Sequence, residues 1–392
     1  MYEVVVVGGG PSGSITAYRC AKAGFKVLVI EKNEVGRRKC CAGGLLQRGL
    51  KHLPLPLPGD IVEREVNEAD FFVDGKIVSL RVPEALAVTV RREKLDAFLL
   101  NSAADAGAAI MEKTAAASIQ EDKDSVKVRT KAAEFTGRYL VIADGSWSMA
   151  GTVLGPSRAD AIAMGAAVEC ETGQPIRNAV GVHLLYNASE LRIGHPKFPM
   201  SAAVFPLKSS VMVSVVAGKE EAGRLKKGVE MVLERMRACG TVNPVGRLCY
   251  HPIPLAPRPI LHSRRTLAVG DAAGFVSPFS GEGLTYALIS AHLASDVISS
   301  ALNKDDPSFI SRYERLCRRD IIRPIRATAA LTPWVHWIAA RVDQEAVLSR
   351  LATDERMKRV ISEIAQDEVR LGNLLRGLLP SLPDLLLSSA KK

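Results

Sequence analysis

Three glycines and one carboxylate near the N-terminus have the spacing of a nucleotide-binding turn. Gly8, Gly10 and Gly13 stand in the order G-x-G-x-x-G, and Glu31 follows. The first glycine allows a tight turn, the second lets the backbone approach a pyrophosphate, and the third lets a helix pack closely. A carboxylate at the position of Glu31 can accept hydrogen bonds from ribose hydroxyls. These residue types at this spacing predict a dinucleotide site.

Two strands and one helix must hold these residues in place. The apolar run Val4–Val7 predicts a buried parallel strand, and Ser14–Lys22 predicts a helix. Val27–Ile30 predicts a second strand that delivers Glu31. A helix N-terminus directed at phosphates offers free N–H groups and the positive end of its dipole. The complete order of elements favours a dinucleotide-binding βαβ unit over one that binds nothing.

Length and charge limit the class of protein. The chain has 392 residues, of which 47% are hydrophobic and 24% charged, enough for two or three globular domains. A formal net charge of +10 favours phosphate-bearing substrates or an anionic membrane surface as partners. The basic residues are spread along the chain without the aromatic-interleaved motif of an RNA binder, so we expect no nucleic-acid partner.

Cysteine and histidine usage adds further limits. Seven scattered cysteines argue against a disulfide framework. His183, His195 and His251 lack metal-ligand spacing, so we expect no metal. The chain enters its first predicted strand at once, and no run reaches the ~18–20 apolar residues that span a bilayer. We therefore expect a cytoplasmic protein and leave a peripheral membrane contact open.

Two later strands also end in residues that can bind a polar ligand. The predicted strands are Tyr139–Ala143 and Leu267–Val269. The residues that follow them are Asp144 and Gly145 in the first case, and Gly270 and Asp271 in the second. An aspartate beside a strand-ending glycine can accept hydrogen bonds from a polyol.

A glycine pair precedes a long apolar helix. Gly281 and Gly283 flank Glu282, and helical spacing begins at Leu284. Glycines here allow the backbone to lie against a flat ring, and the helix dipole would stabilise negative charge on it. A simple helix cap is the alternative interpretation.

Together, the three strand-end motifs resemble the FAD-dependent aromatic-hydroxylase-like flavoproteins, the p-hydroxybenzoate hydroxylase fold. The resemblance implies FAD as cofactor, with Asp271 bonding its ribitol hydroxyls. It also implies that Arg92 contacts the FAD pyrophosphate, for which a guanidinium fork has suitable geometry. A solvated charge at the start of a helix is the alternative for Arg92.

The expected fold class is α/β, with a Rossmann-like FAD-binding domain interleaved with an antiparallel-sheet substrate domain, plus a helical C-terminal region. We assign residues 1–58, 89–160 and 257–305 to the FAD-binding domain. Residues 59–88 and 161–256 form the sheet domain, and residues 306–392 form the helical region. A hairpin turn is predicted at Asp74–Gly75 and a helix over 92–106.

Within this superfamily, residues 1–305 are similar to geranylgeranyl reductases. Cys41 and Gly44 match the C-x-x-G segment of that family, which implies a catalytic role for both. A thiol beside a flavin can tune its redox state or deliver a proton, and the basic run Arg37–Lys39 favours a thiolate. A small buried residue is the alternative for Cys41.

A second family motif, Y-x-W-x-F-P, is only partly kept. Phe205 and Pro206 remain, and the resemblance implies that they bind substrate. Ser201 and Ala203 replace the aromatic pair, which leaves the exact prenyl substrate open.

The resemblance implies an FAD-dependent reductase that saturates isolated C=C bonds of a geranylgeranyl (polyprenyl) group on a lipid or diphosphate. The electron donor, nicotinamide or ferredoxin, stays open. A monooxygenase that hydroxylates an aromatic or a quinone shares the three FAD motifs. A non-catalytic flavin electron-transfer or lipid-binding protein is the third alternative. An arginine stripe over residues 315–326, near Trp334 and Trp337, is either an anionic-lipid contact or a solvated face.

Overall fold

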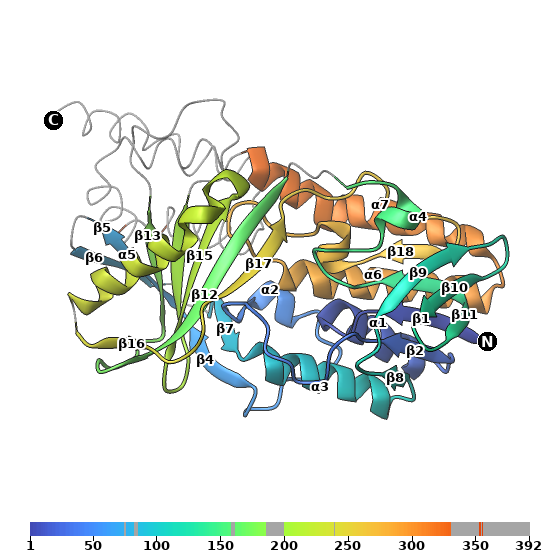
Figure 1. Cartoon of the computed structure of the whole chain (residues 1–392), viewed down its shortest axis with the longest axis horizontal. Helices are drawn as coiled ribbons and strands as arrows, with labels where there is room; N and C mark the ends of the chain where they lie inside the picture. The colour runs from blue at the N-terminus through green and yellow to red at the C-terminus, as the bar shows by residue number, and fades with distance from the viewer. Residues whose placement is uncertain are drawn as a thin grey trace.

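The computed structural model describes residues 1–73, 76–81, 85–157, 161–185, 200–238 and 240–330, together with Thr353 and Glu355. The predicted turn Asp74–Gly75, both tryptophans near residue 335 and most of the predicted C-terminal region lie outside these residues. The described strands form three sheets, which we name A, B and C. Figure 1 shows sheet A at the N-terminal end of the molecule and sheet C at the opposite end.

Sheet A contains all the predicted nucleotide-binding strands. Its strand order is β8-β2-β1-β11-β10-β9, and β18 pairs with residues 140–142 of β11, beyond the part that pairs with β10. The pairs β1–β2, β2–β8, β1–β11 and β11–β18 are parallel, whereas β9, β10 and β11 form an antiparallel meander. The strands are β1 (Tyr2–Val7), β2 (Val27–Ile30), β8 (Ala109–Met111), β9 (Ala116–Glu121), β10 (Val126–Thr130), β11 (Glu134–Ile142) and β18 (Thr266–Ala268). The four strands predicted from the sequence are confirmed, three of them within two residues at each end, whereas β11 begins five residues before the predicted Tyr139.

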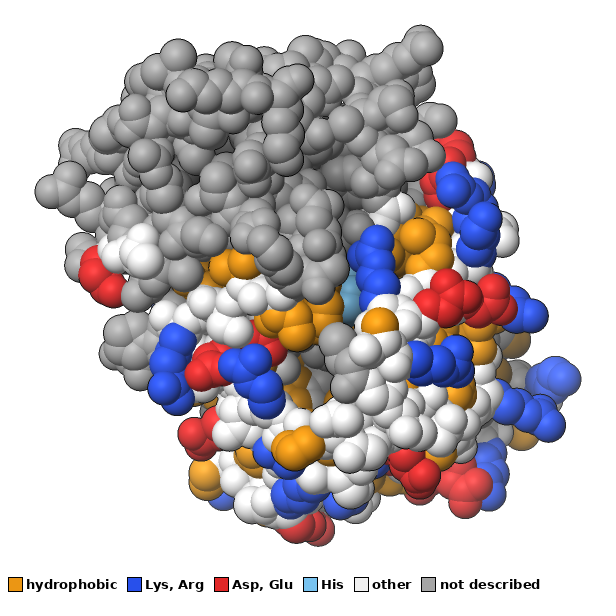
Figure 2. Space-filling model, turned by 90° about the vertical axis from the view of Figure 1, so that its left-hand side faces the viewer, with side chains coloured by type: hydrophobic (Ala, Val, Ile, Leu, Met, Phe, Trp, Pro, Cys, Tyr) orange, Lys and Arg blue, Asp and Glu red, His pale blue; other side chains and the backbone are white. Residues whose placement is uncertain are grey.

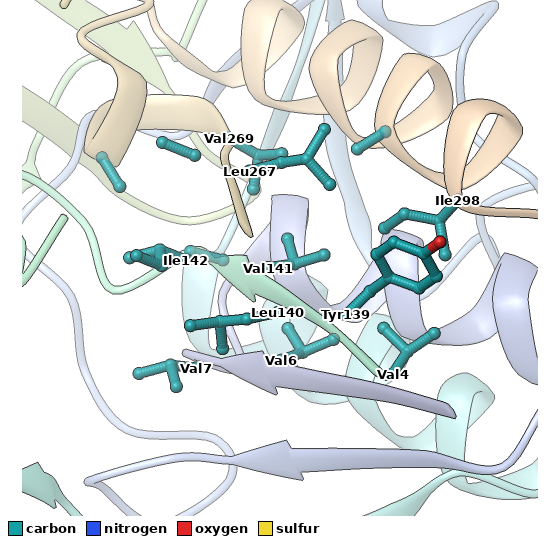
Figure 3. Packing of buried hydrophobic residues seen from close by; sticks show 14 of the residues in the cluster. Val4, Val6, Val7, Tyr139, Leu140, Val141, Ile142, Leu267, Val269 and Ile298 are labelled. Atoms are coloured by element: carbon teal, nitrogen blue, oxygen red, sulfur yellow. The ribbon is translucent and has the colours of Figure 1, made fainter. Parts of the chain in front are cut away.

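The central strands β1, β2 and β18 of sheet A are buried on both faces, which explains their continuous apolar runs. Val4–Val7 in β1 are at most 4% exposed. Helix α1 (Pro11–Lys22) packs against α3 (Arg92–Asp105) and α6 (Leu284–Asn303). Figure 3 shows side chains of β1, β11 and β18 meeting in one core, with Ile298 of α6 beside Tyr139.

Sheet C is largely antiparallel, with one parallel pair between β5 and β13. Its strand order is β16-β12-β15-β14-β13-β5-β6, and β17 pairs with β12. The strands are β5 (Glu68–Val73), β6 (Lys76–Arg81), β12 (Ile162–Thr172), β13 (Ala179–Leu184), β14 (Ser201–Pro206), β15 (Val211–Gly218), β16 (Val242–Pro244) and β17 (Cys249–Pro254).

One helix in this region was not predicted. Helix α5 (Leu225–Arg237) lies across sheet C (Figure 1), so the expectation of sheet alone over residues 161–256 was wrong there. Its buried residues Val229, Val232 and Leu233 pack against Val213 and Val215 of β15. An apolar stripe at helical spacing covers the apolar face of the strand, which explains why this segment is helical.

Sheet B joins the other two sheets. It consists of β3 (Gly44–Leu46), β7 (Ala87–Val90) and β4 (Val62–Val66), and the short helix α2 (Gln47–Leu50) follows β3. Along the chain, strands of sheet C come both before β7 and after β11, and β18 returns to sheet A. The chain therefore passes from sheet A to sheet C and back twice, while the exact domain boundaries stay a prediction.

The arginine stripe lies on the last described helices. Helix α7 (Arg312–Cys317) runs into a π-helical turn at Arg318–Ile322, directly before Pro324. Arg315, Arg319, Arg323 and Arg326 are all exposed, and Arg319 pairs with Asp320. Short helices α4 (Gly151–Leu154), 219–224, 270–273 and 307–311 complete the described elements.

The described surface carries charges of both signs. On the face shown in Figure 2, described Lys and Arg side chains lie beside Asp and Glu side chains. In the part of the chain that the structure describes, no helix combines the length and the apolar character needed to cross a bilayer.

The substitution Leu140→Ala tests whether β11 is central to the packing of sheet A. It is 0% exposed and pairs with both β1 and β18, so Leu140→Ala should lower the free energy of unfolding by about 2–5 kcal/mol. Ile260→Ala is the control because Ile260 is 50% exposed, and it should change stability by less than about 0.5 kcal/mol. Urea denaturation followed by circular dichroism measures both. Equal effects of the two substitutions would contradict this packing.

Candidate functional site

The three sequence motifs meet at one edge of sheet A. Strands β1, β11 and β18 are parallel neighbours, with Val7 opposite Ile142 and Ile142 opposite Ala268. Because all three strands end at the same edge, the segments that follow them lie together. The contacts agree: a Cβ built on Gly270 would lie 2.8 Å from the Ser12 hydroxyl. The Ser146 hydroxyl donates to Asp271 at 3.4 Å.

The three glycines of the turn have different physical roles. Gly8 has a φ of +106°, and a Cβ on it would lie 2.3 Å from the carbonyl oxygen of Ala143. A Cβ on Gly13 would lie 1.9 Å from the carbonyl oxygen of Gly8. Gly10 has a φ of −74°, and a Cβ there would meet no described atom within 4 Å. The fold requires Gly8 and Gly13, whereas the open side of Gly10 fits a ligand that approaches the backbone.

Glu31 braces the turn from the end of β2. One carboxylate oxygen accepts from the Gly9 amide at 2.6 Å, and the other accepts from the Asn33 amide at 2.8 Å. The side chain is almost fully buried. The structure thus gives Glu31 a positioning role, and its predicted contact with ribose stays a prediction.

Arg92 is the centre of a buried ion network rather than a solvated charge. Its guanidinium donates twice to Asp96, at 2.9 and 3.0 Å, and Arg37 donates to the same carboxylate at 3.2 Å. Although burial opposes the charged form, Asp96 and the Cys41 thiol raise the pKa of Arg92 above its usual range. Arg92 therefore stays cationic beside Cys41, and its predicted contact with pyrophosphate stays a prediction.

Cys41 and Gly44 lie where sheets B and C touch. The Cys41 side chain lies beside Arg92 and interacts with it, and its sulfur accepts from the Gly43 amide at 3.5 Å. A Cβ on Gly44 would lie 2.7 Å from Cε1 of Phe205. The Pro206 carbonyl accepts from the Thr89 hydroxyl at 2.7 Å. The structure thus brings the predicted catalytic pair together with the predicted substrate-binding pair.

Asp144 and Gly145 follow β11 as predicted. One oxygen of Asp144 accepts from the Met149 amide at 2.7 Å, whereas Oδ1 is buried without a hydrogen-bond partner among the described residues. Burial raises the pKa of Asp144, against hydrogen bonds that lower it. Gly145 has a φ of +86° and open space where a Cβ would lie. An unused buried acceptor beside an open backbone fits a polar ligand at this edge.

Asp271 sits among groups that the sequence did not single out. Its carboxylate lies 4.0 Å from Nε2 of His251, which comes from β17. Burial and the charge of Lys39 lower the pKa of His251 to about 4, so the ring is neutral at pH 7. Lys39 itself lies near Arg92, and burial followed by that charge lowers its pKa. Finding His251 requires the pairing of β17 with β12, which no local spacing reveals.

The segment before α6 supports both interpretations of its glycines. Glu282 accepts from the Thr285 amide at 2.6 Å and so caps the helix. Gly281 has a φ of +70° and faces sheet C. A Cβ built on it would lie 3.8 Å from Val216 and 4.0 Å from Ile253. A Cβ on Gly283 would lie 3.1 Å from Oδ1 of Asp271. The helix N-terminus therefore lies at the same place as the other motifs.

Known proteins are similar to this chain in sequence and in fold. A family model described as an FAD binding domain matches residues 1–236. The digeranylgeranylglycerophospholipid reductase of Methanocaldococcus jannaschii is 30% identical over 335 residues, 80% of this chain and 82% of that protein. Digeranylgeranylglycerophospholipid reductase 1 of Methanothermobacter thermautotrophicus is 27% identical over 95% of this chain and 98% of that protein. A geranylgeranyl bacteriochlorophyll reductase-like protein from Thermoplasma acidophilum has the same fold, with a TM-score of 0.77 and 21% identity over 98% of this chain and 97% of that one.

Gly10 and Gly13 form a matched pair for testing the turn. Gly10→Ala should leave the stability of the apoprotein unchanged, because the methyl group meets no protein atom, but should weaken FAD binding by at least about 10-fold. Gly13→Ala should lower the free energy of unfolding by about 1–3 kcal/mol. Flavin titration and thermal unfolding measure the two effects. Unchanged FAD affinity in Gly10→Ala would contradict the assignment of the ligand side of the turn.

The geometry and the relatives agree on the cofactor. The family model covers more than half of the chain, and the turn and Asp144 leave a backbone cradle and an acceptor for a ligand. This chain therefore belongs to the geranylgeranyl reductase family of FAD-dependent, aromatic-hydroxylase-like flavoproteins and is an FAD-dependent oxidoreductase.

Proposed function

We propose that this enzyme reduces isolated C=C bonds of a geranylgeranyl, or other polyprenyl, chain carried by a lipid or a diphosphate. The names of the two archaeal relatives support a prenyl substrate. The observation that carries the proposal is the contact between the Cys41–Gly44 segment and Phe205 of sheet C. This contact places the segment that carries Cys41 against Phe205, an apolar residue of sheet C.

Three apolar side chains of sheet C face the Gly44 and Gly281 segments, and we call them the apolar wall. Phe205 lies against Gly44, and Val216 and Ile253 lie against Gly281. Apolar side chains suit a hydrocarbon substrate, and they keep water away from the reacting groups. Ser201 and Ala203 alternate with Phe205 along β14 and so share its face. The departure from the family motif therefore falls on the wall proposed to meet the prenyl chain.

The residues of this chain would hold the proton that the reaction needs. Bound FAD, once reduced, supplies a hydride to the substrate. An isolated alkene is not polarised, so the other carbon must receive a proton. We assign that proton to the thiol of Cys41, whose sulfur the Gly43 amide holds in place. His251 is neutral at pH 7 and is not a cationic acid there.

The test is anaerobic turnover with a strong reductant. The FAD-loaded full chain, dithionite and geranylgeranyl diphosphate, or a digeranylgeranyl glycerophospholipid in detergent, should give products that gain two hydrogens per reduced bond by mass spectrometry. Dithionite avoids the choice between nicotinamide and ferredoxin as donor. Oxygen consumption coupled to a hydroxylated aromatic or quinone product would instead identify a monooxygenase. Reduced flavin without any prenyl product would leave an electron-transfer or lipid-binding role.

Cys41→Ala tests the assigned proton donor. Loss of the thiol should lower turnover by about 10²-fold or more, while the FAD content stays that of the parent. Cys170→Ala is the matched control because Cys170 is buried in sheet C and should retain turnover. Product formation by mass spectrometry measures both variants. An unchanged rate in Cys41→Ala would remove the assignment of this residue.

A further inference from the structure

Two cysteines outside the proposed reaction meet at the junction of sheet C and the segment that leads to Cys41. Cys249 opens β17 opposite Ala167 of β12, and its neutral thiol donates to the Ala167 carbonyl at 3.1 Å. Cys40 comes from the loop between β2 and β3, and its thiol interacts with that of Cys249. The same loop reaches the segment before β17, because a Cβ on Gly246 would lie 2.7 Å from the Arg38 guanidinium, so two segments distant in sequence bring their thiols to one place.

The surroundings of the pair favour one thiolate. Arg38 lies in the same corner, where a Cβ on Gly246 would come within 2.7 Å of its guanidinium. The interaction with the Cys40 thiol and the charge of Arg38 lower the pKa of Cys249 to about 7, although burial opposes this. The interaction with Cys249 and burial raise the pKa of Cys40. Both residues are only partly buried, unlike Cys20, Cys170 and Cys317.

Other described cysteines are poor candidates for the same chemistry. Burial raises the pKa of Cys20 to about 12 and that of Cys170 to about 11. A bridge between the adjacent residues Cys40 and Cys41 would be strained. Reactive thiols sit in electropositive, partly exposed places, and the Cys40–Cys249 pair fits that description.

We propose that Cys40 and Cys249 form a thiol-modification site for low-molecular-weight disulfides, with Cys249 as the attacking thiolate and Cys40 as the resolving thiol. Cys249 Sγ attacks one sulfur of the small disulfide, whose S–S bond breaks and releases one thiolate, which takes a proton. Cys40 Sγ, losing its proton, then attacks Cys249 Sγ and releases the second small thiol. Two protein thiols are oxidised to one disulfide, and the small disulfide is reduced to two thiols.

The resulting bond would join the Cys41 loop to sheet C at the residue next to Cys41. Oxidation would thus fix the position of a loop that also carries Arg37, which pairs with Asp96. The formation of the bond does not depend on which reaction the flavin performs. Its detection is therefore separate from the test of prenyl reduction.

Peptide mapping of the full-length, FAD-loaded protein tests the site directly. After treatment with glutathione disulfide, non-reducing digestion should show residue 40 linked to residue 249, with two free thiols lost and restored by dithiothreitol. Between pH 6 and pH 8 the modification rate should rise about 10-fold and then level off, because the thiolate population saturates above a pKa of about 7. A rate that continues to rise through pH 9, or a protein that keeps all its thiols, would overturn the proposal.

Four variants separate the roles of the cysteines. Cys40→Ser should retain a glutathione adduct on Cys249, Cys249→Ser should form neither adduct nor linkage, and Cys170→Ala should behave like the parent. Cys41→Ser should still form the link between residues 40 and 249. A link that moves to residue 41 in the parent, or an adduct that survives in Cys249→Ser, would contradict the assignment.

Discussion

Close backbone contact between the glycine-rich turn and the end of β11 sets the geometry of the site. A side chain on Gly8 would collide with the Ala143 carbonyl, and one on Gly13 with the Gly8 carbonyl. Without these contacts, the N-terminus of α1 could not sit beside the ends of two other parallel strands. Gly270 extends the same close packing to Ser12, which brings in the third strand. The ligand-facing groups take their positions from this arrangement.

A chain of ion pairs and hydrogen bonds connects the glycine-rich turn to the Cys41 thiol. The Glu31 carboxylate accepts a hydrogen bond from the Gly9 amide and lies 3.8 Å from the Arg37 guanidinium. Arg37 forms an ion pair with Asp96, and Asp96 forms a second ion pair with Arg92. Buried charges persist only when opposite charges and hydrogen bonds compensate their lost hydration. Arg92 then reaches the Cys41 thiol. The cofactor turn and the proposed proton-holding group are thus linked by contiguous contacts.

Local patterns predicted β1, β2, β11 and β18 of sheet A because continuous apolar runs and glycine spacing are short-range signals. The convergence of the three motifs was also predictable, since neighbouring parallel strands end at one edge. Helix α5 was missed although Leu225, Val229 and Val232 already show helical spacing. His251 was missed because its place depends on pairing across about 80 residues, which only the folded register fixes. The Arg92–Asp96 pair stood at i and i+4 in a predicted helix and was readable in principle.

The late position of β18 has a consequence for biosynthesis. Residues 266–268 pair with β11, and the segment after them completes the site begun by residues 8–13. During translation, the N-terminal βαβ unit therefore emerges long before the strand that finishes its sheet. Contacts this distant in sequence close slowly, and the exposed strand edge is open to wrong pairing meanwhile. We expect the nascent chain to depend on chaperone protection until most of it has left the ribosome, with cofactor capture as the last step of maturation.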